Sequence, residues 1–257
     1  MKKKIILIMG LPGSGKTTLA KKISKYLKAE WLNADKVRGK FNDWDFSKVG
    51  ILRQVRRMKQ LADISKKKYV VADFICPLAE QRKIFKPNLI IWMDTIKKGR
   101  FKKMNKLFKK PEKYNLKISE KNLNLNFIKT KNLILGNKWD NKRNTVQMLG
   151  RFQPWHKGHT KIFENSILRA DQVLIMVKDV NGIGDNPYSF NQIKSRIQME
   201  LKEFKNMFRV VLAPNITEIC YGRTVGYKIS KINLPKKIES ISATKIRKRL
   251  RLKGLLK

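Results

Sequence analysis

Eight residues near the start of the chain have the types and spacing that bind phosphate. The segment from Gly10 to Thr17 contains three glycines, which allow backbone N–H groups to curl around phosphate oxygens. Lys16 would reach the β- and γ-phosphates of a nucleotide, and the Thr17 hydroxyl would bind Mg²⁺. The apolar run from Ile5 to Met9 precedes this segment and a helical apolar pattern follows it, as a P-loop requires. The predicted phosphate-binding residues are Gly10, Gly13, Ser14, Gly15, Lys16, Thr17 and Thr18.

Two carboxylates follow later strand-like segments. Asp35 comes just after a short second strand, and Asp73 ends the apolar strand that begins at Tyr69. If both strands run parallel to the first, Asp35 and Asp73 lie at the carboxyl edge of the sheet, beside the phosphates. Asp73 would then hold Mg²⁺ or accept the proton of a substrate hydroxyl. We therefore predict that Lys16, Asp35 and Asp73 are catalytic, and that Thr17 and Asp73 bind the metal.

Several segments of the first half match one family of small-molecule kinases. They are the P-loop, residues Asn33 to Arg38, Phe46-Ser47, Arg56-Arg57, and Ala72 to Pro77 with Arg82 downstream. These segments resemble those of adenylylsulfate kinases, over about residues 3 to 128. The resemblance implies an ATP-dependent kinase. Asn33 replaces a carboxylate of that family, and Asp73 and Cys76 replace two serines, which indicates a remodelled acceptor site.

Basic side chains outside the P-loop are candidates for binding an anionic acceptor. They are Arg38, Arg53, Arg56, Arg57, Arg82 and Arg100. The arginines between Arg38 and Arg57 equally fit the solvated face of an amphipathic helix from about Val49 to Ser65. The basic stretch 97–113 is expected to be a lid that closes over the transferring phosphoryl group, with Arg100 as its candidate.

A second phosphate-binding pattern lies past the middle of the chain. Residues Gly150 to His159 read Gly-Arg-Phe-Gln-Pro-Trp-His-Lys-Gly-His and follow a strand-like run. His156 and His159 are the only two histidines of the chain, and they share one face if a helix has begun there. A further segment, Ile241 to Arg247, opens another helix. Transfer of a nucleotidyl group to a phosphate needs positioning and charge neutralisation rather than a covalent nucleophile, and these residue types supply both.

These two segments resemble the HxGH nucleotidyltransferases, most closely the archaeal-type nicotinamide mononucleotide adenylyltransferases. The resemblance implies that His156, His159 and Arg247 are catalytic and that the nucleotide can be ATP or CTP. Asn186 and Arg196 match the family's Asn-Pro-Phe segment and the Arg that follows it, and are candidates for substrate binding. The residues that the resemblance assigns to the nucleotide are Gly150, Arg151, Phe152, His156, His159, Ser242, Thr244 and Arg247.

The predicted fold class is α/β, with two doubly wound parallel sheets. Residues 1–130 would form a P-loop kinase domain, 131–144 a charged linker, and 145–257 a Rossmann-like nucleotidyltransferase domain. A chain of 257 residues is long enough for two such domains.

The charge of this chain is strongly positive, with 60 Lys and Arg against 19 Asp and Glu and a net charge of +41. Lysine is spread through every segment instead of forming one stripe, so we do not expect nucleic acid as a partner. Cys76 and Cys220 fall in separate domains, which favours reduced thiols and a cytoplasmic location. No segment has the length of a signal peptide core or a membrane span. Homo-oligomerisation stays open.

The sequence thus predicts a bifunctional enzyme: a small-molecule kinase, then a nucleotidyltransferase that releases pyrophosphate. Small anions and nucleoside triphosphates would be its ligands, with ATP and Mg²⁺ in the first domain. Two alternatives stay open. One is nicotinamide riboside kinase joined to nicotinamide mononucleotide adenylyltransferase for NAD synthesis. The other is a polynucleotide kinase acting on nucleic-acid 5′ ends, which salt-sensitive binding of oligonucleotides would support.

Overall fold

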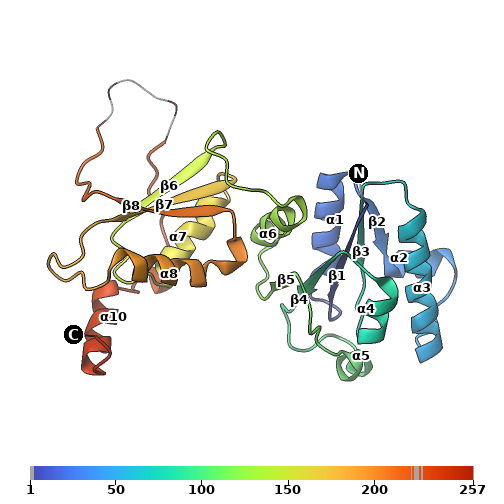
Figure 1. The fold of residues 1–257 in the computed structure, drawn as a ribbon. Coiled ribbons are helices and arrows are strands. Elements are labelled where there is room, and N and C mark those ends of the chain that lie inside the picture. Colours follow the sequence, from blue (N-terminus) through green and yellow to red (C-terminus); the bar gives the residue numbers. More distant parts are fainter. Residues whose placement is uncertain (1–2, 221, 223–225, 227, 257) are drawn as a thin grey trace. The chain divides into compact units, whose positions relative to one another are not determined.

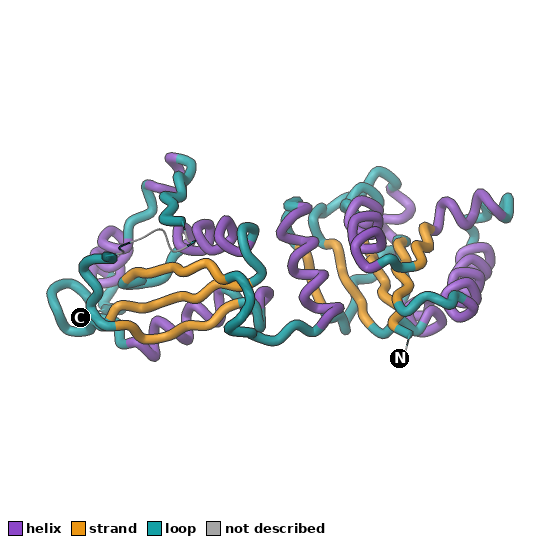
Figure 2. The backbone as a smooth tube through the Cα atoms, turned by 90° about the horizontal axis from the view of Figure 1, so that it is seen from above, coloured by secondary structure: helices purple, strands orange, loops and turns teal. Residues whose placement is uncertain are grey.

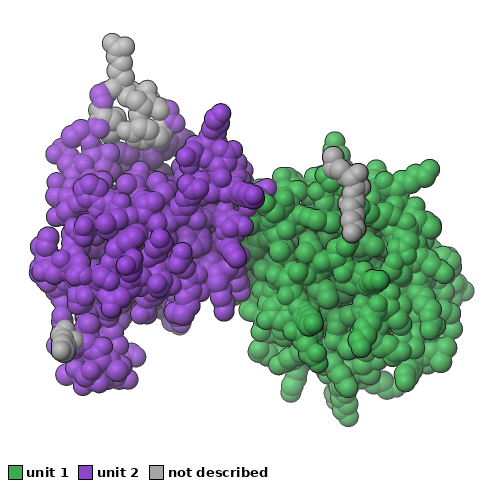
Figure 3. Space-filling view, viewed as in Figure 1, with its two compact units in different colours: residues 1–136 green, residues 137–257 purple. Residues whose placement is uncertain are grey.

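The computed structural model describes residues 3–220, 222, 226 and 228–256. The chain divides into two compact units, Met1–Gly136 and Asn137–Lys257 (Figure 3). The division falls inside the predicted linker 131–144. Residues 131–135 nevertheless belong to a helix whose Ile134 is fully buried, so the structured part of the first unit extends beyond the predicted boundary at residue 130.

The first unit is an α/β domain built around a five-stranded parallel sheet (Figures 1 and 2). Its strands are β1 (Lys4–Gly10), β2 (Glu30–Asn33), β3 (Tyr69–Asp73), β4 (Leu89–Met93) and β5 (Leu116–Ile118). Its helices are α1 (Lys16–Leu27), α2 (Ala34–Lys40), α3 (Lys48–Ile64), α4 (Ala79–Phe85), α5 (Lys102–Leu107) and α6 (Leu123–Leu135). The strand order is β2-β3-β1-β4-β5, so that β1 is central.

The central strand β1 is buried on both faces because helices cover both. Ile5, Leu7 and Met9 pack in one core with residues of α2, α3 and α4. Ile6 and Ile8 point to the other face, where they pack with residues of α1 and α6. This explains the unbroken apolar run of the strand. The doubly wound arrangement that the sequence predicted is confirmed for this unit.

The parallel register brings the ends of three strands together. Asp73, the last residue of β3, is opposite Ile8 of β1 and Asn33 of β2. Gly10, at the end of β1, is opposite Met93 of β4. The P-loop, Asp73 and the start of α2 therefore share the carboxyl edge of the sheet, where open α/β sheets bind their ligands.

The second unit contains three parallel strands in the order β6-β7-β8. These are β6 (Thr145–Gly150), β7 (Gln172–Lys178) and β8 (Phe208–Ala213), connected through α7 (Lys157–Ile167) and α8 (Phe190–Glu200), with the short 3₁₀ helix η1 (Lys202–Phe204) before β8. Further along lie α9 (Lys236–Glu239) and α10 (Ala243–Leu252).

The faces of this smaller sheet are not equally covered. Val173, Ile175 and Val177 of β7 are buried, whereas Leu174 and Met176 on the opposite face are only half-buried. The described residues between 214 and 235 contain no strand. A β-α-β-α-β unit is therefore what the described part shows, and the doubly wound sheet predicted for this half is not confirmed. No helix among the described residues is long and apolar enough to cross a membrane.

Candidate active sites

The P-loop of the first unit has the backbone geometry of a phosphate cradle. A Cβ atom on Gly10 would lie 2.4 Å from the carbonyl oxygen of Met93, so that only glycine fits between β1 and β4. Gly13 and Gly15 have φ angles of 88° and 91°, which side-chain-bearing residues rarely adopt. The Ser14 hydroxyl is buried, and among the described residues it has no hydrogen-bond partner. A bound phosphate would satisfy this orphaned polar atom.

Lys16 begins α1, and its ammonium group is held inside the P-loop. Nζ donates a hydrogen bond of 2.8 Å to the carbonyl oxygen of Leu11, and the residue is only 8% exposed. Burial lowers the pKa of Lys16 to about 8, although the nearby Asp73 and Asp35 carboxylates oppose this shift. A desolvated cation beside a phosphate cradle is stabilised by an anionic ligand, so this geometry fits the predicted role of Lys16.

Asp73 accepts hydrogen bonds from three side chains at the strand ends. Its Oδ2 atom accepts from the Thr17 hydroxyl at 2.7 Å and from the Asn33 amide at 3.0 Å. Its Oδ1 atom accepts from Trp31 Nε1 at 2.7 Å. The structure thus brings together Thr17 and Asp73, the two predicted metal ligands, and adds Trp31, which the sequence analysis missed. Trp31 stands two residues before Asn33, on the same face of β2, which is the signal that would have found it.

Three of the six arginines predicted to bind the acceptor lie around one carboxylate, Asp43. Arg53 pairs with Asp43 at 2.8 Å, Arg57 at 3.0 Å and Arg38 at 3.8 Å. Hydrogen bonds from Arg53 and Arg57 hold the pKa of the Asp43 carboxyl well below its usual range. Asp43, which the sequence analysis did not single out, therefore occupies the centre of this arginine cluster.

The remaining basic candidates of this unit lie elsewhere. Arg56 is exposed on α3, and the Arg82 guanidinium donates to the Cys76 carbonyl at 3.0 Å. Arg100 is exposed and stacks on Phe101. Only Arg38, Arg53 and Arg57 are gathered around one point.

The predicted lid segment is anchored to the P-loop. A Cβ on Gly99 would lie 2.9 Å from the Pro12 carbonyl oxygen. The side chain of Asn105, on α5, bonds to both the N–H and the carbonyl of Gly99 at 2.8 and 2.9 Å. The Thr95 hydroxyl donates to the Ser14 carbonyl at 2.8 Å. The base of the segment is thus fixed beside the phosphate cradle.

In the second unit, the two histidines lie at the start of α7 and stack with their rings 3.8 Å apart. Nδ1 of His156 accepts the Gly158 backbone N–H at 3.1 Å, and Nδ1 of His159 accepts the N–H of His156 at 3.2 Å. Because both Nδ1 atoms are acceptors, each neutral ring carries its proton on Nε2. A Cβ on Gly158 would lie 2.9 Å from His156 Cε1, which explains the glycine between them.

Burial keeps both rings neutral. It lowers the pKa of His156, with Arg196 adding to the effect, and lowers the pKa of His159 to about 3, with His156 adding to the effect. The pair can therefore donate hydrogen bonds from Nε2 to an anion as neutral imidazoles at physiological pH.

This low pKa predicts that the second unit loses stability in acid. The unfolded chain binds a proton on His159 near pH 6.5, whereas the folded chain binds it only near pH 3. The contribution to stability is complete above pH 6.5 and is lost progressively as the pH falls toward 3. Calorimetric unfolding between pH 7 and 4 should show this decline, with a smaller slope in His159→Asn. An identical slope in wild type and variant would contradict the assignment.

Arg247 joins the histidine loop to a second loop. It is 7% exposed, and its guanidinium bonds to the Gln153 carbonyl and to Asp185, with Nε to Asp185 Oδ2 at 2.8 Å. Asp185, which also pairs with Arg251, has its pKa lowered to about 2 by hydrogen bonds from both arginines. Arg247, which is predicted to contact phosphate, also holds the two loops together in the structure.

The other candidates of this unit occupy different surroundings. Ser242 precedes α10 as its N-cap residue, and the Thr244 hydroxyl accepts from Arg247 at 3.3 Å. Arg196 donates to the Trp155 carbonyl at 3.0 Å. Phe152 is buried, and Arg151 is exposed. Asn186 is buried, and its Oδ1 has no partner among the described residues.

We expect Arg247→Gln to reduce stability as well as turnover. The substitution leaves the buried carbonyl of Gln153 without its donor, at a cost of about 1–3 kcal/mol. Thermal unfolding measures this loss, and Arg249→Gln, an exposed position on the same helix, is the matched control. An unchanged melting temperature for Arg247→Gln would leave Arg247 with a role toward the ligand alone.

Comparison with known proteins places the recognisable family within the first unit. The AAA domain family matches residues 5–109. No curated protein matches the chain. This match and the P-loop geometry show that the first unit is a P-loop nucleotide-binding domain.

Several solved kinase structures also resemble the chain. The APS kinase CysC of Mycobacterium tuberculosis, in complex with AMPPNP and APS, is 19% identical, with coverage of 52% of this chain and 98% of that chain and a TM-score of 0.47. The shikimate kinase of Acinetobacter baumannii, in complex with shikimate, is 20% identical over 54% and 96% of the two chains, with a TM-score of 0.40. A gluconokinase of Sinorhizobium meliloti 1021 is 10% identical over 52% and 90%, with a TM-score of 0.39.

Proposed function

We propose that the chain is a bifunctional transferase: the first unit is an ATP-dependent kinase of a small anionic molecule, and the second is a nucleotidyltransferase. The kinase proposal rests on the position of Lys16 and Thr17, in the first turn of α1, beside Asp73, the last residue of β3. The transferase proposal rests on the pair of neutral histidines, whose Nδ1 atoms accept backbone N–H groups, so that each ring carries its proton on Nε2.

In the kinase, the P-loop amides and Lys16 hold the β- and γ-phosphates of ATP. Thr17 and Asp73 supply the hydroxyl and carboxylate that suit Mg²⁺, which usually binds proteins through one or two carboxylates together with substrate phosphates. When bound, the ion neutralises charge on the phosphates. Asp73 also accepts the proton of the acceptor hydroxyl. Trp31 and Asn33 fix its carboxylate for this task.

Replacement of Asp73 tests this role. Asp73→Ser should lower the rate of ADP formation by about 10²-fold, the scale of a lost base or metal contact. Asp73→Asn keeps an acceptor for the neighbouring donors and should lose a similar factor, because it cannot take a proton. Asp63→Ser, an exposed aspartate at the end of α3, is the control. Unchanged turnover in Asp73→Ser would give Asp73 a purely structural role.

The acceptor of the kinase is a small anion, as the basic surroundings and the resemblance to adenylylsulfate kinases suggest. The carboxylate of Asp43 neutralises part of the positive charge of the arginine cluster. The cluster therefore favours an acceptor with less negative charge than three unpaired arginines would. Nicotinamide riboside is the alternative from NAD synthesis, and a polynucleotide 5′-hydroxyl is the alternative from nucleic-acid processing.

In the transferase, His156 and His159 donate to the triphosphate of ATP or CTP from the start of α7. The helix N-terminus adds positive potential at the same place. The phosphate of the acceptor attacks the α-phosphorus, and pyrophosphate leaves toward Ser242, Thr244 and the first turn of α10. Arg247 contributes its charge while it holds the two loops in position.

A substrate panel tests the proposed activities. The full-length protein is incubated with ATP or CTP and with adenylylsulfate, nicotinamide riboside, nicotinamide mononucleotide or a 5′-hydroxyl oligonucleotide, and ADP and pyrophosphate are measured separately. We expect ADP with a small anion. Faster phosphorylation of the oligonucleotide at physiological salt would favour the polynucleotide kinase instead.

A further inference from the structure

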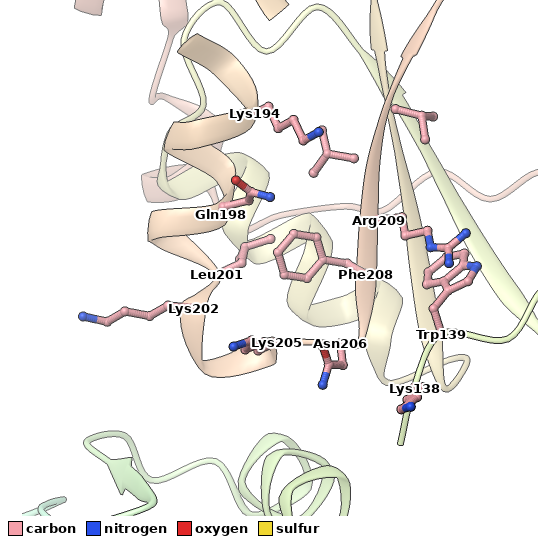
Figure 4. Close-up of a pocket in the computed structure, with 12 residues that line it drawn as sticks. Lys138, Trp139, Lys194, Gln198, Leu201, Lys202, Lys205, Asn206, Phe208 and Arg209 are labelled. Carbon is pink, nitrogen blue, oxygen red and sulfur yellow. The ribbon is translucent and has the colours of Figure 1, made fainter. Parts of the chain in front are cut away.

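The open edge of β8 forms the floor of a groove in the second unit, away from the residues assigned above. The groove has a volume of about 710 Å³, and four consecutive residues of β8, Phe208 to Val211, line it (Figure 4). Consecutive side chains of a strand point to opposite faces of the sheet. A groove on one face of the sheet would be lined by every second residue. Since four consecutive residues line this groove, it runs along the edge of β8.

The backbone of β8 offers hydrogen-bonding groups along this edge. Among the described strands, β8 pairs with β7 alone. The Met207 carbonyl accepts from the N–H of Val173 in β7 at 2.9 Å, and the Ala213 carbonyl accepts from the N–H of Asp179, just after β7, at 2.8 Å. In a strand, the N–H and C=O of one residue point to the same side, and this side alternates along the chain. Phe208, Val210 and Leu212 therefore direct their N–H and C=O groups away from β7, and Phe208 and Val210 do so where they line the groove.

The groove is strongly basic on both of its walls. None of its lining residues is acidic, and five are cationic: Lys138, Lys194, Lys202, Lys205 and Arg209. Lys194 and Gln198 lie on the α8 wall, whereas the Arg209 guanidinium stacks 5.0 Å over the Trp139 ring on the other side of β8 (Figure 4).

We propose that this groove binds an extended acidic segment of a partner protein, which adds a strand to β8. An edge strand pairs with an extended peptide through alternating donors and acceptors. A peptide backbone provides both, whereas the phosphodiester backbone of DNA provides acceptors only, so the floor fits a peptide. Acidic side chains on alternate faces of the added strand would meet the cations of both walls, which act as charge partners for the segment.

The probe for this proposal is a labelled eight-residue peptide that repeats Glu-Glu-Val-Val, so that both faces of the extended peptide carry Glu. Fluorescence anisotropy with the full-length protein at physiological salt should show saturable binding. Two peptides serve as controls: one has Pro at two of the Val positions, which removes backbone donors, and the other has Lys in place of Glu. Each control should bind at least about tenfold more weakly, by loss of strand pairing or of charge complementarity.

Variants of the groove complete the test. Lys194→Glu and Arg209→Glu should each weaken binding of the Glu-Val peptide about tenfold, whereas Lys253→Glu, the same charge change at an exposed residue after α10, should have little effect. Val210→Pro removes an N–H that points into the groove and keeps the bonds to β7. It should therefore weaken binding while circular dichroism and the melting temperature stay near wild type. If Val210→Pro does not fold, the two charge reversals decide.

Three results would overturn the proposal. Equal binding of the Pro-containing peptide would exclude strand addition. Tighter binding of a twelve-residue oligothymidylate, weakened by the same charge reversals, would make the groove a nucleic-acid site. Self-association of the protein that Val210→Pro abolishes would make a second copy of this chain the occupant.

Discussion

Replacing Lys16 should abolish ADP formation and leave pyrophosphate release nearly unchanged. Lys16→Ala removes the cation that neutralises charge on the transferring phosphoryl group, and we expect a loss of about 10³-fold. The second unit has its own phosphate-binding set around His156 and His159, so its rate should stay within about twofold of wild type, well inside the tenfold that 1.4 kcal/mol would produce. The two products, measured in the same reaction mixture, give both rates.

The stability of Lys16 variants separates chemistry from folding. Lys16 is buried and its pKa is lowered to about 8, so the native state holds a poorly solvated charge. Lys16→Met keeps the length of the side chain and removes this charge. It should be as inactive as Lys16→Ala without loss of thermal stability. Retained ADP formation would contradict the role of Lys16, and loss of both products in a folded variant would contradict independent sites.

His159→Asn should reduce pyrophosphate release about a hundredfold, the equivalent of roughly 3 kcal/mol. The asparagine side chain can place an oxygen where Nδ1 now accepts the His156 N–H, but it has no donor at the position of Nε2. The fold is thus expected to persist while the contact to the triphosphate is lost. ADP formation in the first unit serves as the internal control.

His159→Gln is the matched variant, because its amide nitrogen lies near the position of Nε2. We expect it to retain more turnover than His159→Asn. If the two variants lose turnover equally and the melting temperature falls in both, the ring acts through packing against Phe152 and Trp155 instead. The second unit would then need another function.

The sequence by itself determined those features that depend on neighbouring residues. The apolar run of β1, the glycines that follow it and the helical pattern after Lys16 predict a strand, a P-loop and a helix from local propensity and spacing. The position of Asp73 at a strand end also followed, because parallel strands share their carboxyl edge. The three-residue separation of His156 and His159 predicted a shared face if a helix had begun at His156; in the structure His156 is instead the extended N-cap residue of α7, and its ring stacks on that of His159.

Only the tertiary structure decided which partners these side chains have. Trp31 donates a hydrogen bond to Asp73, which is 42 residues away in the chain. Asp43 accepts hydrogen bonds from both Arg53 and Arg57. Arg247 donates to Asp185, which is 62 residues away. Such contacts depend on how strands and helices pack, and residue spacing does not encode them. Packing also decides the start of the predicted charged linker 131–144. Residues 131–135 belong to α6, because a helix with one buried face can carry charged side chains on its other face. The open edge of β8 is likewise a property of the sheet, because strand order is set by packing and not by the sequence of the strand itself.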